Sequence, residues 1–337
     1  MKKNWIKNKQ KILTVIGSAV LLILFFICFI VFVPVNPSSH DTIVYAVKKG
    51  SSDSQIANDL QKLGLIRSGY FFRFYAILSF QHSILKAGQY NLSPKDSIYQ
   101  IARKMAQGQV IKDEVVILEG WTLKGISNYL ESKGVCGKDE FITLAQNDYS
   151  GDFSFLSDKP KKLSLEGYLF PDTYQISDDE TCQDVLTLML ANFDKKLTPD
   201  IRAAIKKQKK SIFDIVTMAS MIEKEVRTID DKKIVSGILW KRIAIGMPLQ
   251  LDCTINYITN GNSPSVSIKN TKIDSPYNTY VYPGLPKGPI SSPGMSSINA
   301  AIYPKKTNYW YWLSDGVTHF SETLEQHNSA KATYLGT

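Results

Sequence analysis

The feature that most constrains this chain is an uncharged apolar run near the N-terminus, from Ile12 to Val33. Its 22 residues would form about 33 Å of helix, enough to cross the hydrocarbon core of a bilayer. A cleaved signal peptide has a shorter apolar region and a small-residue cleavage site, whereas "PVNPSSH" follows here. The sequence therefore predicts a retained transmembrane helix over residues 12–33.

The charges around this run predict its orientation. Five lysines precede it within residues 1–11, and the next basic residue after it is Lys48. Positive charge is retained on the cytoplasmic side, which leaves about 300 residues outside the membrane. We therefore predict a single-pass protein of the cell membrane, with residues 1–11 as a cytoplasmic tail and the chain after the helix extracytoplasmic.

Charge and cysteine usage exclude some classes of function. The net charge is +9, but without the five N-terminal lysines 35 basic residues face 31 acidic ones. Such a small excess does not favour a nucleic-acid partner. The four histidines and four cysteines show no recognised metal-ligand spacing, so we expect neither a metal nor a cofactor. Cys136 and Cys182 could form a disulfide or stay as free buried thiols, and both alternatives remain open.

A small module is expected directly after the apolar run. Residues 34–41 form a polar linker with two prolines. Over residues 42–110 short strand and helix patterns alternate, with Ser or Asp at helix starts and Gly at helix ends. The patterns predict strands over 42–47 and 87–94 and helices over 51–64, 70–80 and 96–108. We expect these elements to pack as a small α+β module.

Residues 111–337 are expected to form a larger domain of mixed structure, so the predicted fold class is α+β. A long stretch rich in Pro, Gly and Ser predicts a loop inside this domain. The expected elements are a β-rich run over 110–118, a helix within 119–134, helices from about 184 to 246, the loop over 275–296, and helices over 297–303 and 321–334.

The stretch "DIVTMASMIEKEVR" contains the first candidate for catalysis. Up to Ile222 apolar residues lie on nearly all sides of the expected helix, which is typical of a buried helix. Glu223 follows, and partial burial raises the pKa of a carboxyl group toward the range that suits a general acid. The structural alternative is an ion pair of Glu223 with Arg227 at the end of the helix. Glu225 would project about 200° from Glu223, so a second functional group must come from another segment.

Two further stretches are candidates for sugar binding. In "PLQLDCTINY" the alternation predicts a half-buried strand, with Gln250, Asp252 and Thr254 on its polar face. Hydrogen-bonding groups without Lys or Glu suit sugar hydroxyls, although an ordinary strand gives the same pattern. The loop "SPYNTYVYPGLPKGPISSPG" carries Tyr277 and Asn278, which combine ring faces with polar tips. Its alternative is a structural loop packed on the core.

Several motifs occur together in a characteristic order. They are "EGWTLKGISNYL", "LEGYLFPDTY", "MASMIEKEV", "GMPLQLDCTINY", "SPYNTYVYPGLPKGPISSPG" and "THFSETLEQHN". In this order they resemble the endolytic peptidoglycan transglycosylases of the YceG-like family, over nearly the whole chain. The first Glu of the family's E-K-E motif is its catalytic residue and corresponds to Glu223. Residues that match positions expected to line the cleft are Glu166, Gln250, Asp252, Tyr277 and Asn278, with Thr254 as a further supporting residue.

The resemblance implies a reaction that needs one carboxyl group. Glu223 would protonate the glycosidic oxygen between N-acetylmuramic acid and N-acetylglucosamine, and would then take a proton from the muramic C6 hydroxyl as a 1,6-anhydro ring closes. It also implies a LysM-like module over residues 42–110, a YceG-like catalytic domain over 111–337, control of glycan strand length, and peptidoglycan strands and synthases as candidate partners. Two alternatives stay open: a two-carboxylate muramidase with Asp252 as base or nucleophile, and a scaffold that binds glycan or synthases without catalysis.

Overall fold

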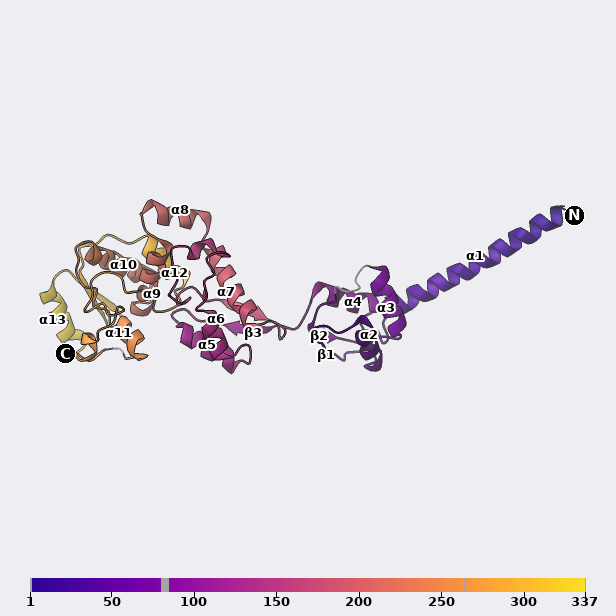
Figure 1. Cartoon of the computed structure of the whole chain (residues 1–337), viewed down its shortest axis with the longest axis horizontal. Coiled ribbons are helices and arrows are strands. Elements are labelled where there is room, and N and C mark those ends of the chain that lie inside the picture. The colour runs from indigo at the N-terminus through magenta and orange to yellow at the C-terminus, as the bar shows by residue number, and fades with distance from the viewer. Residues whose placement is uncertain (1, 80–84, 264, 337) are drawn as a thin grey trace. The chain divides into compact units, whose positions relative to one another are not determined.

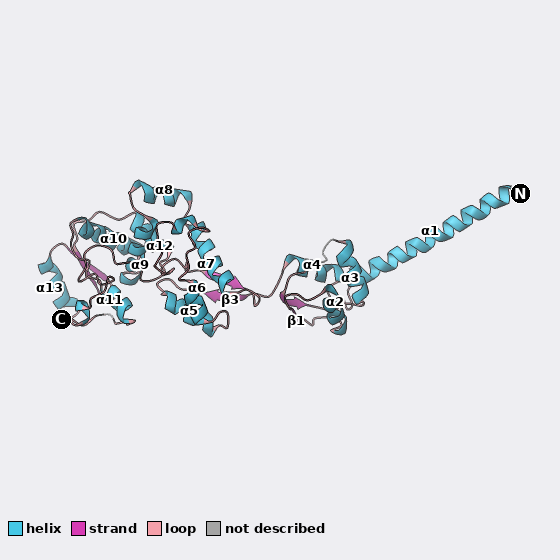
Figure 2. Cartoon of the chain, in the orientation of Figure 1, coloured by secondary structure: helices cyan, strands magenta, loops and turns pink. Residues whose placement is uncertain are grey.

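The structure is a computed structural model that describes residues 2–79, 85–263 and 265–336 (Figure 1). Within these residues it is a helix-rich protein with three two-stranded sheets (Figure 2), which confirms the α+β fold class. The chain divides into two compact units. Unit 1 comprises Met1–Asp113 and Gln175–Asp179, and unit 2 comprises Glu114–Tyr174 and Glu180–Thr337.

Unit 1 combines the N-terminal helix with a small module of strands and helices. Every strand and helix predicted between residues 42 and 110 is present, although the end of the helix predicted over 70–80 lies outside the described residues. Serine caps begin two of its helices, and Gly108 ends one of these two with a φ of 66°. The elements are α1 (Lys2–Phe32), β1 (Ile43–Val47), α2 (Asp53–Lys62), α3 (Gly69–Leu78), β2 (Gly88–Leu92) and α4 (Ile98–Gln107).

The core of the module lies between its two-stranded sheet and its helices. Strands β1 and β2 pair antiparallel, with Tyr45 opposite Tyr90. Alternate side chains of both strands are buried together with apolar residues of α2, α3 and α4. The end of α1 belongs to the same core, because Ile30 and Val31 are buried in it. The rest of α1 differs, since most of its described side chains before Ile30 are exposed.

Helix α1 contains a segment, Lys11–Phe32, that is long and apolar enough to cross a membrane by length and composition. It covers nearly the same residues as the run from which a transmembrane helix is predicted. Because only a small share of its surface is buried by the rest of the chain, its apolar side chains need another environment than the protein core.

Unit 2 is built mainly from helices. Strands β3 and β4 form one two-stranded sheet, and β5 pairs antiparallel with β6, Tyr311 opposite Ser321. The elements after α4 are β3 (Asp113–Val116), α5 (Leu123–Ser132), α6 (Lys138–Leu144), the 3-10 turn Ser154–Leu156, β4 (Thr173–Ile176), α7 (Cys182–Lys196), α8 (Pro199–Lys207), α9 (Ile212–Glu225), α10 (Ile229–Ala244), α11 (Asp252–Thr259), the 3-10 turn Asn270–Lys272, α12 (Met295–Ile302), β5 (Tyr311–Ser314), β6 (Thr318–Ser321) and α13 (Leu324–Tyr334).

Helix α9 forms the centre of unit 2. Ser211 and Asp214 form a capping box at its start, which satisfies backbone N–H groups that have no partner within the helix. Every residue from Ile215 to Ile222 is buried, because α9 packs against α10, α11 and α12. The expectation of a helix buried on all sides is therefore confirmed, and the helix ends at Glu225.

The strand predicted for "PLQLDCTINY" is wrong. Helix α11 begins at Asp252 and continues to Thr259. Residues two apart on a helix project about 200° from each other, so Asp252 and Thr254 do not share a face. The alternation of apolar residues in the sequence does not correspond to alternating burial, because Cys253, Thr254 and Ile255 are all buried in succession. A short run of this length fits either period, and tertiary packing decides between them.

Cys136 and Cys182 are joined in a disulfide, with their Cα atoms 5.2 Å apart, which decides between the two alternatives for these cysteines. The bond links the start of α7 to the segment between α5 and α6. Glu140 lies beside both sulfur atoms in a grouping that metal sites also show. Metal binding by cysteine needs thiolates, and the disulfide occupies both sulfurs.

Candidate active site

The carboxylate of Glu223 is enclosed by groups from two other helices. Its side chain is 7% exposed. Oε1 accepts a hydrogen bond from Lys232 Nζ of α10 at 2.8 Å. Oε2 accepts from the backbone N–H of Gly294 at 2.9 Å and from Ser297 Oγ at 2.7 Å. The alternative pairing with Arg227 is not formed, because α9 ends at Glu225 and the next residue is extended.

These partners complement a negative charge. Gly294 is the N-cap residue of α12, so Glu223 sits where the unpaired N–H groups and the dipole of that helix favour an anion. Lys232 is 4% exposed and also donates to Ser296 Oγ at 2.8 Å. A buried ion pair of this kind is strongly destabilised when one partner is removed. Glu223 is therefore both a fixed carboxylate and a structural link between three helices.

A second carboxyl group, which sequence reasoning missed, shares this site. A Cβ added at Gly294 would overlap the carboxyl group of Glu119, and the N–H of the same Gly294 donates to Glu223. Partial burial raises the pKa of Glu119, the negative charge of Glu223 raises it further, and Lys232 opposes both effects. The only sequence signal was its position at the start of the motif "EGWTLKGISNYL".

The segment that carries Glu119 is fastened to the loop before α12. Gly120 N–H donates to the carbonyl of Ser292 at 2.8 Å, and Ser292 N–H donates back to the carbonyl of Trp121 at 2.7 Å. Lys224 Nζ, next to Glu223 in the chain, also reaches the carbonyl of Gly120 at 3.4 Å. The partly exposed ring of Trp121 packs edge-on against Tyr129. An aromatic ring thus lies two residues after Glu119 in the chain.

Glu166, predicted to line the cleft, is buried, and its hydrogen bonds hold the chain just after Glu119 and Trp121. Its two carboxylate oxygens accept from the N–H of Leu123 at 2.9 and 3.1 Å, at the first residue of α5. Tyr257 Oη donates to it at 3.4 Å. Burial raises the pKa of Glu166 to about 7, although the hydrogen bonds from Leu123 and Tyr257 oppose the shift. The geometry assigns Glu166 a positioning contact on the chain just after Trp121.

Asp252 lies with a different group of residues. Its carboxylate accepts a hydrogen bond from Tyr280 Oη, and its charge raises the pKa of Glu225. Burial is the larger cause of that raised pKa, and hydrogen bonds from Cys253 and Trp312 oppose it. The carboxyl group that shares the surroundings of Glu223 is thus Glu119, and Asp252 belongs to the surroundings of Glu225.

Thr254 and Asn278 hold the backbone of the loop in place. Thr254 Oγ1 donates to the carbonyl of Leu251 at 2.7 Å and lies 3.0 Å from Thr279 Oγ1. Asn278 is 1% exposed, and its Nδ2 donates to the carbonyl of Ile273 at 2.7 Å. These contacts satisfy buried polar groups, as buried side chains require. They leave neither residue as an obvious sugar ligand.

Gln250 and Tyr277 keep surface that a ligand can reach. Gln250 is exposed and has a φ of 55°, a conformation that costs free energy in residues other than glycine and occurs often at functional sites. Its N–H donates to the carbonyl of Thr279 at 3.0 Å. Tyr277 is half-buried, and its ring centroid lies 5.0 Å from that of Tyr257, the tyrosine bound to Glu166.

Comparison with known proteins finds one matching family model and several similar proteins. The model of the YceG-like family matches residues 45–333. The chain belongs to the YceG-like family. A protein of Bacillus subtilis (strain 168) named endolytic murein transglycosylase is 33% identical over 316 residues, which cover 90% of this chain and 87% of that protein. One of the same name from Streptococcus pneumoniae serotype 2 is 29% identical over 332 residues, covering 90% of this chain but 60% of its own longer length.

A solved structure supports the same family. The crystal structure of a YceG-like protein from Listeria monocytogenes is 32% identical, with a TM-score of 0.58, and the match covers 87% of this chain and all of that one. In this chain the E-K-E stretch falls at the end of the buried helix α9, where Glu223 meets Lys232 and the N-terminus of α12.

Proposed function

We propose that this YceG-like protein is a membrane-anchored endolytic lytic transglycosylase that cleaves peptidoglycan strands, with Glu223 as catalytic acid and base. The observation that carries the proposal is the buried Glu223 carboxylate, held by Lys232, Gly294 and Ser297 at the end of α9. The names of the Bacillus and Streptococcus relatives agree with the proposed activity.

In the proposed reaction Glu223 donates a proton to the glycosidic oxygen between N-acetylmuramic acid and N-acetylglucosamine as the bond from that oxygen to C1 breaks. The C6 hydroxyl of the muramic residue then bonds to C1 and gives its proton to Glu223, so that no water is consumed. Lys232, Gly294 and Ser297 stabilise the carboxylate that appears after the first proton transfer. Hydrogen-bond donors that are already in position around a developing charge usually lower the activation barrier more than any other single effect.

The proton for the first step is assigned to the pair formed by Glu119 and Glu223. Two neighbouring carboxyl groups tend to hold one proton between them, because the charge on one raises the pKa of the other. Burial and the charge of Glu223 both raise the pKa of Glu119. We propose that the shared proton resides on Glu119 in the free enzyme and on Glu223 when the glycosidic oxygen is protonated.

Product analysis tests the activity. Purified peptidoglycan is digested with the protein, and the new strand ends are identified by mass spectrometry. We expect 1,6-anhydro ends, lighter than reducing ends by one water.

Glu223→Gln should lower the rate by at least about a hundredfold, the range for loss of a general acid. Glu225→Gln, two residues away in the same helix, is the matched control and should retain activity. Equal activity of Glu223→Gln and wild type would refute the site.

A second candidate function is a two-carboxyl muramidase, and Glu119 is the observation that favours it. A hydrolase needs two carboxyl groups that flank the bond. Glu119 contacts the same Gly294 that binds Glu223, whereas the sequence had suggested Asp252 for this place. Reducing ends alone in the digest would favour the muramidase over the lyase. A digest without new ends would favour the scaffold that binds glycan or synthases without catalysis.

The membrane topology and the role of the module are parts of the same proposal. The Lys11–Phe32 segment would anchor the chain, with the N-terminus in the cytoplasm and the chain after this segment outside. The module over residues 42–110 would bind glycan as a LysM-like unit, near the synthases that make new strands. Protease added to spheroplasts should remove the bulk of the chain, and full protection would refute this topology.

A further inference from the structure

Helix α3 of unit 1 presents three faces with different surroundings. Gly69, Phe72 and Ala76 are buried in the core of the module. Phe71 and Tyr75 contact α1, with ring centroids 6.2 Å from Phe26 and 6.5 Å from Phe32. The third face is exposed and largely apolar. Its large side chains and their exposed fractions are Tyr70 73%, Phe74 37%, Ile77 55% and Leu78 61%.

This exposed face is one continuous stripe. Its residues follow the spacing i, i+4, i+7 and i+8, which places them on one side of a helix. A contiguous apolar patch of this kind on a folded module indicates an interaction site. The stripe lies next to the face of α3 that contacts α1 through Phe71 and Tyr75. Any occupant of the stripe must therefore lie beside the apolar helix.

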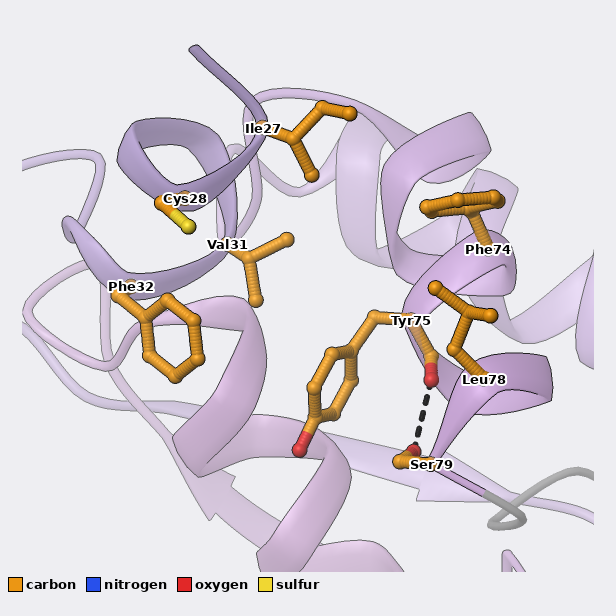
Figure 3. A pocket seen from close by; sticks show the side chains of 8 residues that line it. All are labelled: Ile27, Cys28, Val31, Phe32, Phe74, Tyr75, Leu78 and Ser79. Atoms are coloured by element: carbon orange, nitrogen blue, oxygen red, sulfur yellow. Dashed lines mark hydrogen bonds between the residues drawn. The ribbon is translucent and has the colours of Figure 1, made fainter. Parts of the chain in front are cut away.

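A groove connects the stripe to α1. It has a volume of about 250 Å³, and Figure 3 shows Ile27 and Val31 of α1 facing Phe74 and Leu78 of α3 across it. The hydroxyl group of Ser79, which lines the groove together with Tyr75, donates to the carbonyl of Tyr75 at 2.7 Å (Figure 3). Since that hydroxyl is satisfied, the walls offer apolar surface to whatever enters.

The contacts with α1 determine how deep α3 would lie relative to the membrane. The segment Lys11–Phe32 has 22 residues and spans about 33 Å, only slightly more than a hydrocarbon core of about 30 Å. The rings of Phe26 and Phe32 that touch α3 therefore lie within about 9 Å of the end of the segment. If α1 crosses the membrane, α3 must lie at the level where acyl chains meet headgroups.

Two arginines lie where headgroups are expected. Arg67 donates to the carbonyls of Val33 at 2.8 Å and Pro34 at 2.7 Å, and so caps the end of α1. Arg73 is exposed and belongs to the same side of α3 as the apolar stripe. Long cationic side chains at the edge of an apolar face reach the phosphate level while their stems stay in the apolar region.

We propose that the exposed face of α3 is a membrane-contact surface, seated in the outer leaflet beside α1, with lipid acyl chains as its occupant. The inference rests on the proposed membrane anchor and adds a second point of attachment. With two helices in the leaflet, the module cannot swing freely about the end of α1. It is held at the bilayer surface.

Spin labels on the full-length chain in phospholipid nanodiscs test this surface. Cys28→Ser and Cys253→Ala remove the free thiols, and single cysteines then carry the label at Ile77 or Leu78. The matched control is Val44 of β1, which is also apolar and 58% exposed, and Figure 1 shows strand β1 on the side of the module away from α1. Leu22, in the middle of the Lys11–Phe32 segment, reports on the anchor.

We expect labels at 77 and 78 to collide more with oxygen, which dissolves in lipid, than with a water-soluble nickel chelate. The label at 44 should show the reverse. Chelate access at 77 and 78 with a lipid-exposed Leu22 would overturn the inference and leave the anchor intact. Shielding of 77 and 78 from both reagents would overturn it in favour of a protein partner or a second copy. Chelate access at Leu22 would refute the anchor itself.

Discussion

Glu223 and Glu225 lie two residues apart at the end of one helix, and their surroundings differ completely. Glu223 meets an ammonium group, a helix N-terminus and a hydroxyl group. Glu225 is buried with Trp312 Nε1 at 3.3 Å and the thiol of Cys253 as hydrogen-bond donors, and burial raises its pKa. The comparison teaches that burial alone does not identify a catalytic carboxylate. What distinguishes Glu223 is a set of donors that can stabilise its charge when it appears.

Removal of the ammonium group should have the largest effect. Lys232→Met keeps much of the volume but leaves Glu223 without its ion-pair partner. Loss of one member of a buried pair costs about 3–5 kcal/mol of unfolding free energy, and we expect activity to fall together with stability. Urea unfolding followed by circular dichroism measures the first effect and release of soluble muropeptides the second.

The matched change for Lys232→Met is Trp312→Phe, which removes a hydrogen bond to Glu225. A single neutral donor contributes about 1 kcal/mol, so this variant should lose less stability and keep its activity. Equal losses of unfolding free energy in the two variants would contradict the distinction drawn between Glu223 and Glu225.

Glu119→Gln should have the next largest effect. If the proton resides on Glu119 in the free enzyme, wild-type activity falls as the pH rises through the raised pKa of that group. Glutamine cannot supply the proton, so we expect about a 10- to 100-fold lower rate and a changed alkaline side of the pH–rate profile. A lower rate with an unchanged profile would indicate that Glu119 only shapes the site.

Sequence reasoning identified the parts of the site that depend on local pattern. The buried helix α9 and Glu223 at its end follow from apolar residues on all sides up to Ile222. The partners of Glu223 could not be predicted, because Lys232 and Gly294 lie on other segments and meet it through tertiary packing. Glu119 was missed for the same reason, since its motif has no helical or strand period that points to a carboxyl partner.

The fold shows the same division between local and tertiary information. Capping serines and terminal glycines marked the helices of unit 1 well. The strand predicted through Asp252 failed, because the apolar alternation in its sequence does not correspond to alternating burial, and Cys253 to Ile255 are all buried in α11. The hairpin of β5 and β6 was not predicted at all, and there "YWLSDGVTHF" has its turn in the three residues Asp315 to Val317.

Glu166 gives a third carboxylate for the comparison, buried without a cation among its hydrogen-bond partners. Its pKa is about 7 in the folded protein and about 4.3 in the unfolded chain. Between these values the folded state binds one more proton, so stability falls as the pH rises and the loss is complete above about pH 7. The loss is at most about 4 kcal/mol.

Thermal unfolding of wild type and Glu166→Gln between pH 4 and 8 measures this contribution. The glutamine cannot ionise, so the variant should lose less stability than wild type as the pH rises. Parallel curves for the two proteins would show that Glu166 does not titrate in this range.

The smallest effect is expected for Asp252→Asn. The carboxylate accepts from Tyr280 Oη and lies near Glu225, so asparagine keeps an acceptor for the tyrosine and removes a charge that raises the pKa of Glu225. We expect a change in rate of less than about tenfold, below the range for loss of a general acid or base, and unchanged anhydro ends by mass spectrometry. A muramidase with Asp252 as its base would instead lose its reducing ends in this variant. Glu119→Gln changes the other candidate carboxyl group. The rates of the two variants together show whether catalysis by Glu223 requires Glu119 or Asp252.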